Sequence, residues 1–561
     1  MPTRAQQLNL FRYVTRLAAE HQTKSVGNFE VGDLEPRNRR SASRMVDCMD
    51  VISAFLRTVR QQPDSIAIID GDERVSWREL AERIGIIAAA LRRFGVRRES
   101  TVAILSLSST KVFELFYAVP WAGGRVCPLN YRLTATEIIE IVEDANVEIL
   151  FVDEAFVDSV PTLKASARHI IFVGAGQAPE GMIDYESLLG EAQALRHSDC
   201  SEEDVACLYY TGGTTGKAKG VMLTHRNIFA NALNFALATN LTEQDRVLHC
   251  GPMFHVASGS RVYNAGIFGA SNVIIPRFEA HEVLKNIELH QVSVVSLVPT
   301  MLNTIVHLHD FGSYDVSSLR MILYGASQIS PALLDTAMSK FDGVAFCQAY
   351  GQTEVAPFAT VLAPRYHCLD GPLSGKLRSV GRPIGSVEVR VVDTDDSDLP
   401  TGTVGEIIIR GPNVMKGYLN KPELTAIALR GGWMHSGDLG FFDEDGFLYV
   451  VDRAKDMIIS GGENIYSVEV ENAICAHPAV SECAVFGIPD IQWGETVHAV
   501  IVLKKDYRLE SSDIIQHCRR LIGGFKLPRS IEFRNEPMPL SGANKILKNT
   551  LRDAYLTSRT G

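Results

Sequence analysis

The sequence predicts an α/β protein that continues into two smaller units, and three observations support this prediction. From about residue 50 onward, apolar runs typical of strands alternate with helical patterns, and continuous apolar strands between helices are typical of a sheet covered on both faces. Residues 380–450 change to short β runs separated by Gly, Pro and Asp turns, which indicates a small β subdomain. The segment after Lys455 mixes both patterns and indicates a compact α+β unit.

The large α/β part begins with strands and helices in alternation. Ser76 and Glu79 have the spacing of a capping box, which starts a helix at residue 77, and Gly95 ends that helix. Thr224 is expected to cap a helix that begins at His225 or Arg226. The other elements expected here are strands at 66–70, 101–107, 148–152 and 169–173 and a helix at 111–121.

The later elements are shorter. Residues 292–298 and 321–324 predict buried strands, and a helix is expected to start at Pro299. Because ligands of open α/β sheets bind at the carboxyl ends of strands, the loops 209–221, 324–327 and 350–354 are predicted to be walls of one site. The β subdomain should contain strands at 387–392, 406–410 and 447–451. The last α+β unit is expected to be built of the segments 473–477, 480–488, 498–503, 512–521 and 531–534.

Bulk properties narrow the class of protein. At 561 residues the chain is long enough for more than one domain, and its formal net charge of −11 argues against nucleic acid as the main partner. Ten cysteines without a C-x-x-C pair are typical of reduced thiols, which predicts a cytoplasmic protein rather than a zinc site or a disulfide framework. No apolar stretch is long enough to span a bilayer, and no secretory signal is recognisable. The composition of residues 1–45 favours a flexible extension over an arm that touches a membrane.

The stretch from Tyr209 to Val221 has the composition of a phosphate-binding loop. It contains four glycines, three threonines and two lysines, directly after an apolar run. Glycines let backbone N–H groups approach a ligand, and hydroxyl and ammonium groups donate to anionic oxygens. It is not a Walker A loop, because Gly212 and Gly216 enclose three residues instead of four and Ala218 follows Lys217. A flexible surface hairpin is the alternative interpretation of this stretch alone.

Together with three later motifs, this stretch resembles the signature of the adenylate-forming superfamily, which comprises acyl- and aryl-CoA synthetases, luciferases and peptide-synthetase adenylation domains. The resemblance covers roughly residues 50–555, and four motifs in the right order are more specific than any one of them. The later motifs are Tyr350-Gly351-Gln352-Thr353-Glu354, Ser436-Gly437-Asp438-Leu439 and the segment 452–465, followed by a final lysine, Lys545, on 539–548.

The resemblance implies a domain division and a two-step reaction. After an extension at 1–45, a large AMP-binding domain would span 46–454, and a small mobile domain at 455–561 would swing about Lys455. A carboxylate attacks the α-phosphorus of ATP and releases pyrophosphate, and a thiol, usually that of coenzyme A, then displaces AMP to form a thioester. The implied cofactors are ATP, Mg²⁺ and coenzyme A, and electrostatic stabilisation should dominate the first step.

The same resemblance assigns roles around the nucleotide. The β- and γ-phosphates would be held by Thr211, Thr214, Thr215 and Lys219, and Mg²⁺ by Glu354 and Thr214, since this ion prefers hard oxygen donors. Thr353 would bond the α-phosphate, and Asp438 would accept from the ribose hydroxyls with the help of Arg453. The adenine would be bordered by Gly325, Ala326, Tyr350 and Gly351.

Lys545 matches the adenylation lysine, which can bridge the incoming carboxylate and the α-phosphate. The superfamily usually has Gly before it, where Asn544 stands here, but Asn tolerates a left-handed backbone better than most residues. Lys548 is the weaker competitor for this role. Ala218 and Ser467 also stand where prolines are usual, a change expected to alter loop stiffness more than chemistry. For coenzyme A the resemblance points to Gly461 and Gly462, which would line the pantetheine tunnel, and to Lys526.

The substrate pocket is implied at His255, Arg261, Gly325 and Gly351. His255 matches the gate between the acyl pocket and the nucleotide, with a semi-buried structural histidine as the alternative. Arg261 is less expected. Either it faces solvent or a domain seam, which is favoured because charges are seldom buried unpaired, or it binds a second polar or carboxylate group of the substrate.

The resulting prediction is an ATP-dependent acyl-CoA ligase, an acid–thiol ligase. The small residues Ala257 and Gly259 suggest room for a medium- or long-chain fatty acid or a ring-bearing acid. An enzyme that loads a stand-alone acyl carrier protein is the alternative, and luciferase-like chemistry has no positive support. The sequence is compatible with a homodimer and with peripheral contact to a membrane, and it decides neither.

Overall fold

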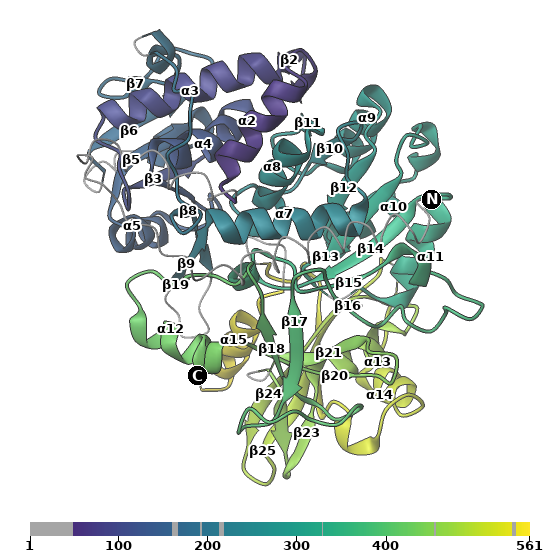
Figure 1. Cartoon of the computed structure of the whole chain (residues 1–561). Coiled ribbons are helices and arrows are strands. Elements are labelled where there is room, and N and C mark those ends of the chain that lie inside the picture. The colour runs from purple at the N-terminus through teal and green to yellow at the C-terminus, as the bar shows by residue number, and fades with distance from the viewer. Residues whose placement is uncertain are drawn as a thin grey trace, which may run out of the picture. The chain divides into compact units, whose positions relative to one another are not determined.

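The computed structural model describes residues 49–159, 167–190, 193–211, 218–327, 329–453, 456–505, 507–540 and 546–560 (Figure 1). Three predicted features lie outside these residues: the extension at 1–45, the expected hinge residue Lys455 and the expected adenylation lysine Lys545. No helix of the described ranges combines the length and the apolar character needed to cross a membrane.

Two large, mostly parallel sheets confirm the α/β prediction. The eight-stranded sheet has the order β19-β9-β8-β4-β3-β5-β6-β7. Its centre is parallel, and β8, β9 and β19 form an antiparallel edge. All five residues of β3 are buried, as expected for a strand covered on both faces. The strands are β3 (Thr101–Leu105), β4 (Arg125–Pro128), β5 (Val147–Asp153), β6 (His169–Val173), β7 (Ile183–Asp184), β8 (Val205–Thr211), β9 (Lys219–Thr224) and β19 (Gly417–Tyr418).

The nine-stranded sheet has the order β16-β15-β14-β13-β12-β10-β11-β1-β2. Its inner strands are parallel, and hairpin partners close it at both edges. The strands are β1 (Ile66–Asp70), β2 (Glu73–Ser76), β10 (Arg246–His249), β11 (Ser271–Ile274), β12 (Val294–Leu297), β13 (Met321–Gly325), β14 (Ala345–Tyr350), β15 (Thr360–Leu362) and β16 (Arg382–Pro383).

The helices of this region begin where the capping residues predict. The capping box at Ser76 is present and opens α3 (Trp77–Arg93). Thr224 caps α7 (His225–Thr239) through its bond from the Asn227 N–H. The other helices are α2 (Val51–Gln61), α4 (Thr110–Ala122), α5 (Ala135–Asp144), α8 (Val256–Phe268), α9 (Ala280–His290), α10 (Pro299–Val306), α11 (Pro331–Lys340) and α12 (Pro422–Ala428).

The two smaller units also have the predicted character. A four-stranded antiparallel sheet, β17-β18-β20-β21, forms the β subdomain, and a second antiparallel sheet with β26 added in parallel forms the last unit. The segment expected at 473–477 contains the end of α13, a helix that begins at Ser467 and ends at Cys475. The bounds are β17 (Glu388–Val392), β18 (Gly405–Arg410), β20 (Met434–Phe442), β21 (Leu448–Arg453), β22 (Ile458–Ser460), β23 (Glu463–Ile465), α13 (Ser467–Cys475), β24 (Val480–Asp490), β25 (Gly494–Leu503), α14 (Ser511–Cys518), β26 (Ser530–Arg534) and α15 (Lys548–Thr560).

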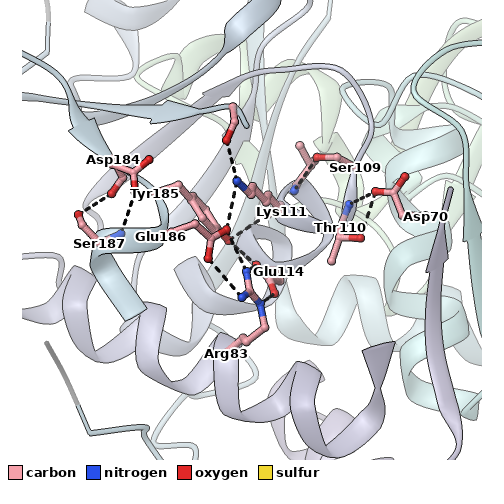
Figure 2. Close-up of polar contacts among 12 residues, drawn as sticks. Asp70, Arg83, Ser109, Thr110, Lys111, Glu114, Asp184, Tyr185, Glu186 and Ser187 are labelled. Carbon is pink, nitrogen blue, oxygen red and sulfur yellow. Dashed lines mark hydrogen bonds and ion pairs between the residues drawn. The ribbon is translucent and has the colours of Figure 1, made fainter. Parts of the chain in front are cut away.

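A charge network around the buried Glu114 joins α3, α4 and the segment after β7 (Figure 2). Glu114 of α4 is fully buried and accepts hydrogen bonds from the Arg83 guanidinium and, at 2.6 Å, from the Tyr185 hydroxyl. Glu186 pairs with the same Arg83 at 3.3 Å and with Lys111 at 3.1 Å. Both oxygens of Glu114 are therefore satisfied, and the network ties three chain segments together without an unpaired charge.

Candidate active site

The Gly-rich stretch is the connection of a hairpin between β8 and β9. Thr211 and Lys219 are cross-strand partners at the end of this hairpin, whereas Thr214 and Thr215 lie on the part of the loop outside the described residues. The Lys219 ammonium lies 5.2 Å from the centre of the Tyr418 ring. Tyr418 belongs to β19, which pairs with β9.

Glu354 lies beside this hairpin although it follows β14 of the other large sheet. It is 8% exposed, and its Oε1 accepts a 2.8 Å hydrogen bond from the Tyr418 hydroxyl. The backbone N–H of Met415 donates to the Glu354 carbonyl oxygen, which holds the segment before β19 against it. The fold therefore places Lys219, Glu354 and Tyr418 together, and Tyr418 is a residue that no sequence signal marked.

The surroundings of Glu354 fit a divalent cation. In the part of the chain that the structure describes, the Tyr418 hydroxyl is the donor to its carboxylate and no cationic side chain forms an ion pair with it. A buried carboxylate without a counter-charge is costly, and a hard oxygen donor is what Mg²⁺ prefers. Thr353, the preceding residue, is equally buried at 8% exposure.

A second group of expected residues meets between β14 and the β subdomain. The Tyr350 hydroxyl donates to Asp438 Oδ2 at 2.8 Å, and Arg453 Nε lies 3.4 Å from Asp438 Oδ1. Asp438 and Arg453 are cross-strand partners on β20 and β21. Burial and the adjacent Asp438 carboxylate raise the pKa of Tyr350 well above its usual range, so the phenol stays protonated and donates. Asp438 is thus held in place from two sides.

A cavity lies between α8 and the ends of β12 and β13. It contains about 580 Å³ of empty space, part of it open to solvent. Its wall is mainly apolar, with a few polar groups, which is typical of sites for small molecules. The lining residues are Gly251, Pro252, His255, Ala257, Ser258, Arg261, Ser296, Leu297, Val298, Met301, Leu323, Tyr324, Gly325, Ala326, Ala349 and Phe358.

His255 and Gly325 stand at this cavity as expected. His255 caps α8, and its Nδ1 accepts the Ala257 N–H at 3.3 Å, so in this arrangement Nδ1 carries no proton. Gly325 ends β13, and a Cβ there would lie 2.2 Å from the Ala349 carbonyl oxygen. Only glycine allows so close an approach of the two strand ends.

The structure contradicts the favoured interpretation of Arg261. The side chain is 3% exposed and lines the cavity instead of facing solvent or a domain seam. It is buried because α8 presents the residues at 257, 258 and 261 to one side.

Two glycines expected near the pocket do not line the cavity. Gly351 is absent from its wall, and a Cβ there would lie 1.9 Å from the Pro357 carbonyl oxygen. The small size of Gly259 serves packing rather than substrate room, because a Cβ there would lie 2.3 Å from the Tyr209 hydroxyl and 2.5 Å from the Met253 carbonyl oxygen.

In the last unit, several residues expected to bind coenzyme A also have a structural role within the unit. Gly461 and Gly462 both have positive φ, at 62° and 86°, and form the two-residue turn between β22 and β23; such a turn selects glycine by itself. Lys526 forms a bidentate contact with Glu469, with both oxygens at 2.7 Å. Any contact of Lys526 with coenzyme A therefore competes with Glu469.

Lys548 is engaged inside the protein. Its ammonium pairs with Glu471 at 2.7 Å and donates to the Ser467 hydroxyl at 2.7 Å. The Ser467 N–H in turn donates to Asp452. Ser467 is therefore more than a missing proline, since proline offers neither this N–H nor a hydroxyl. These contacts make Lys548 a poor competitor of Lys545.

Comparisons with known proteins agree with this arrangement. Residues 55–419 match the model of the family described as AMP-binding enzyme, and residues 469–545 match that of the AMP-binding enzyme C-terminal domain. The chain belongs to the AMP-binding enzyme family. It is an AMP-forming acid–thiol ligase of the adenylate-forming superfamily, and Lys455 lies between the two matched segments.

Characterised relatives are similar along nearly their whole length. A feruloyl-CoA synthase from Amycolatopsis sp is 36% identical over 501 residues, which is 89% of this chain and 98% of that protein. A 2-succinylbenzoate–CoA ligase from Bacillus mycoides is 34% identical over 491 residues, 87% of this chain and 96% of that protein. The o-succinylbenzoate CoA synthetase from Bacillus subtilis, solved with its acyl-adenylate intermediate, has a TM-score of 0.79 at 32% identity, covering 89% of this chain and 98% of that one.

Proposed function

We propose that this ligase joins a ring-bearing aromatic carboxylic acid to coenzyme A, with ATP and Mg²⁺, through an acyl-adenylate. The observation that carries the proposal is the cavity lined by Ala349, the residue before Tyr350, which is mainly apolar but contains the buried charge of Arg261. A simple fatty chain has no group that could face this charge, so of the two substrate classes expected we retain the ring-bearing acid. The relatives named for feruloyl-CoA and 2-succinylbenzoate support the same class.

In this proposal each residue group has a distinct task. Asp438, held by Tyr350 and Arg453, accepts from the ribose hydroxyls and so orients the nucleotide. Thr211 and Lys219 approach the outer phosphates from the hairpin edge. Glu354 and Thr214 would hold Mg²⁺, which when bound would supply positive charge to the phosphate oxygens.

The carboxylate of the acid would enter from the cavity. His255 stands at the start of α8 and Gly325 at the end of β13, and both line the cavity. Lys545 would bridge the carboxylate and the α-phosphate, cancelling charge as the two anions approach. Coenzyme A would then be guided by the segment with Gly461, Gly462 and Lys526 after the last unit moves about Lys455.

The experiment is a pyrophosphate-release assay with the full chain and a panel of aromatic and fatty acids, each with and without coenzyme A. We expect turnover with aromatic acids that requires ATP, Mg²⁺ and coenzyme A, and acyl-CoA as the product by mass spectrometry. Glu354→Gln keeps the shape of the side chain and removes its charge, so it should lose most of the activity at low Mg²⁺. Preferred turnover of fatty acids would refute the proposed substrate class, and release without CoA-dependent turnover would favour the carrier-protein alternative.

A further inference from the structure

Arg261 is a buried cation without an anionic partner in the described part of the chain. It is 3% exposed, and no Asp or Glu is among the residues that line its cavity. Two titratable groups that interact with its charge are neutral at pH 7, because burial lowers the pKa of His249 to about 4 and raises that of Cys347 to about 12. Burial also lowers the pKa of Arg261, to about 9, which still leaves the guanidinium protonated at neutral pH.

The contacts of Arg261 within the protein satisfy only part of its hydrogen-bonding capacity. Its guanidinium carbon lies 4.2 Å and 4.7 Å from the ring centres of Phe235 and Phe358. The Asn264 side-chain amide has one orientation in which both its oxygen and its nitrogen form hydrogen bonds. In that orientation its oxygen accepts from Arg261 Nη1 at 2.6 Å. Arg261 Nε, by contrast, is buried and has no hydrogen-bond partner among the described residues. Cation–π contacts stabilise the charge but accept no hydrogen bond.

A second polar group of the same cavity, the Ser296 hydroxyl, is also buried without a hydrogen-bond partner among the described residues. Ser296 follows Val295 on β12 and lines the cavity, and its hydroxyl oxygen is buried without a partner in the described ranges. Buried polar groups are nearly always hydrogen-bonded, so two unsatisfied groups on one cavity indicate that a ligand completes them.

The position of Arg261 relates it to one end of the acid. His255 and Arg261 both line the cavity, and six residues of α-helix separate them by about 9 Å along the axis of α8. With the reacting carboxylate at His255 and Gly325, a substrate group that meets Arg261 would lie farther along the cavity, away from the reacting carboxylate.

We propose that Arg261 is a specificity residue that binds an oxygen acceptor at the distal end of the aromatic acid, a carboxylate in preference to a neutral oxygen. This inference rests on the proposed aromatic substrate class and adds to it the chemistry of the distal substituent. A distal carboxylate would neutralise the guanidinium and use the fork geometry of its N–H groups. A neutral methoxy or carbonyl oxygen would accept one hydrogen bond and leave the charge unpaired.

The test uses three non-reactive acyl-sulfamoyl adenosine analogues with the same phenylpropenoyl core, carrying a distal carboxylate, a distal methoxy group or no substituent. Dissociation constants are measured by calorimetry on the full chain for wild type, Arg261→Met and Arg261→Lys. Because a hydrogen bond to a charged group contributes roughly the equivalent of a 10- to 100-fold change in affinity, Arg261→Met should weaken binding of the carboxylate analogue by about this factor. Binding of the unsubstituted analogue should change about threefold at most, and Arg261→Lys should recover part of the loss.

Two results would overturn the inference, and they differ from each other. If Arg261→Met weakened all three analogues equally, Arg261 would only shape the cavity, while the aromatic substrate class would survive. If wild type bound none of the three, the proposed aromatic function itself would fail. Two controls distinguish a folding defect from a loss of substrate recognition. They are the thermal unfolding midpoint of each variant and its affinity for ATP alone.

Discussion

Removing the Tyr350 hydroxyl should show whether its hydrogen bond to Asp438 positions the nucleotide or only stabilises the fold. In Tyr350→Phe, Asp438 loses the 2.8 Å hydrogen bond to Oδ2 and keeps the longer contact of 3.4 Å with Arg453. A hydrogen bond to a charged group contributes about 1.5–3 kcal/mol, and 1.4 kcal/mol corresponds to a tenfold change. If Asp438 orients the ribose, the KM for ATP should rise by about 10- to 100-fold, whereas the KM for the acid should change little.

The assay is pyrophosphate release at saturating acid with ATP varied, together with equilibrium binding of ATP. Tyr185→Phe is the matched control, because it also removes a buried tyrosine hydroxyl that donates to a carboxylate, Glu114, at 2.6 Å. Both variants should lower the thermal midpoint, but Tyr185→Phe should leave the KM for ATP unchanged. An unaltered KM for ATP in Tyr350→Phe would refute the reasoning, since the hydroxyl would then serve stability alone.

Three further outcomes are expected. Ser467→Pro should weaken CoA-dependent turnover about tenfold or more, because Oδ2 of the buried Asp452 loses the Ser467 N–H donor while Oδ1 keeps that of Arg453; Ser467→Ala, which keeps the Ser467 N–H, should be milder, and equal effects would contradict this account. Gly325→Ala should abolish most ATP-dependent activity, because the new Cβ would lie 2.2 Å from the Ala349 carbonyl oxygen; wild-type kinetics would show that the strand ends can separate. Because burial lowers the pKa of folded His249 to about 4, below an unfolded value of about 6.5, the unfolded state binds more protons in this window. The contribution of His249 to stability should therefore be full above about pH 6.5 and fall by about 1.4 kcal/mol per pH unit towards pH 4. Because burial also lowers the pKa of His225 and His367 to about 4, the check is that urea unfolding of His249→Gln has a smaller pH slope than that of wild type.

Local sequence signals determined the elements and the family. The capping box at Ser76 and the N-cap at Thr224 work within four residues of chain, so they predict where α3 and α7 begin. Apolar runs between helices predicted the two covered sheets, and ordered glycine, threonine and acidic motifs predicted the adenylate-forming reaction.

Tertiary structure alone decided which residues meet. Tyr418 reaches Glu354 because β19 pairs with β9, a contact between residues 64 positions apart that has no local pattern. Ser467 and Lys548 likewise meet across 81 positions. The general rule that charges avoid burial predicts that Arg261 faces solvent or a domain seam, and this prediction is wrong because the packing of α8 against its neighbours places the charge in the cavity. A sequence determines which side chains are available at each position of a helix, but only the packed neighbours determine whether a given face meets solvent or a substrate.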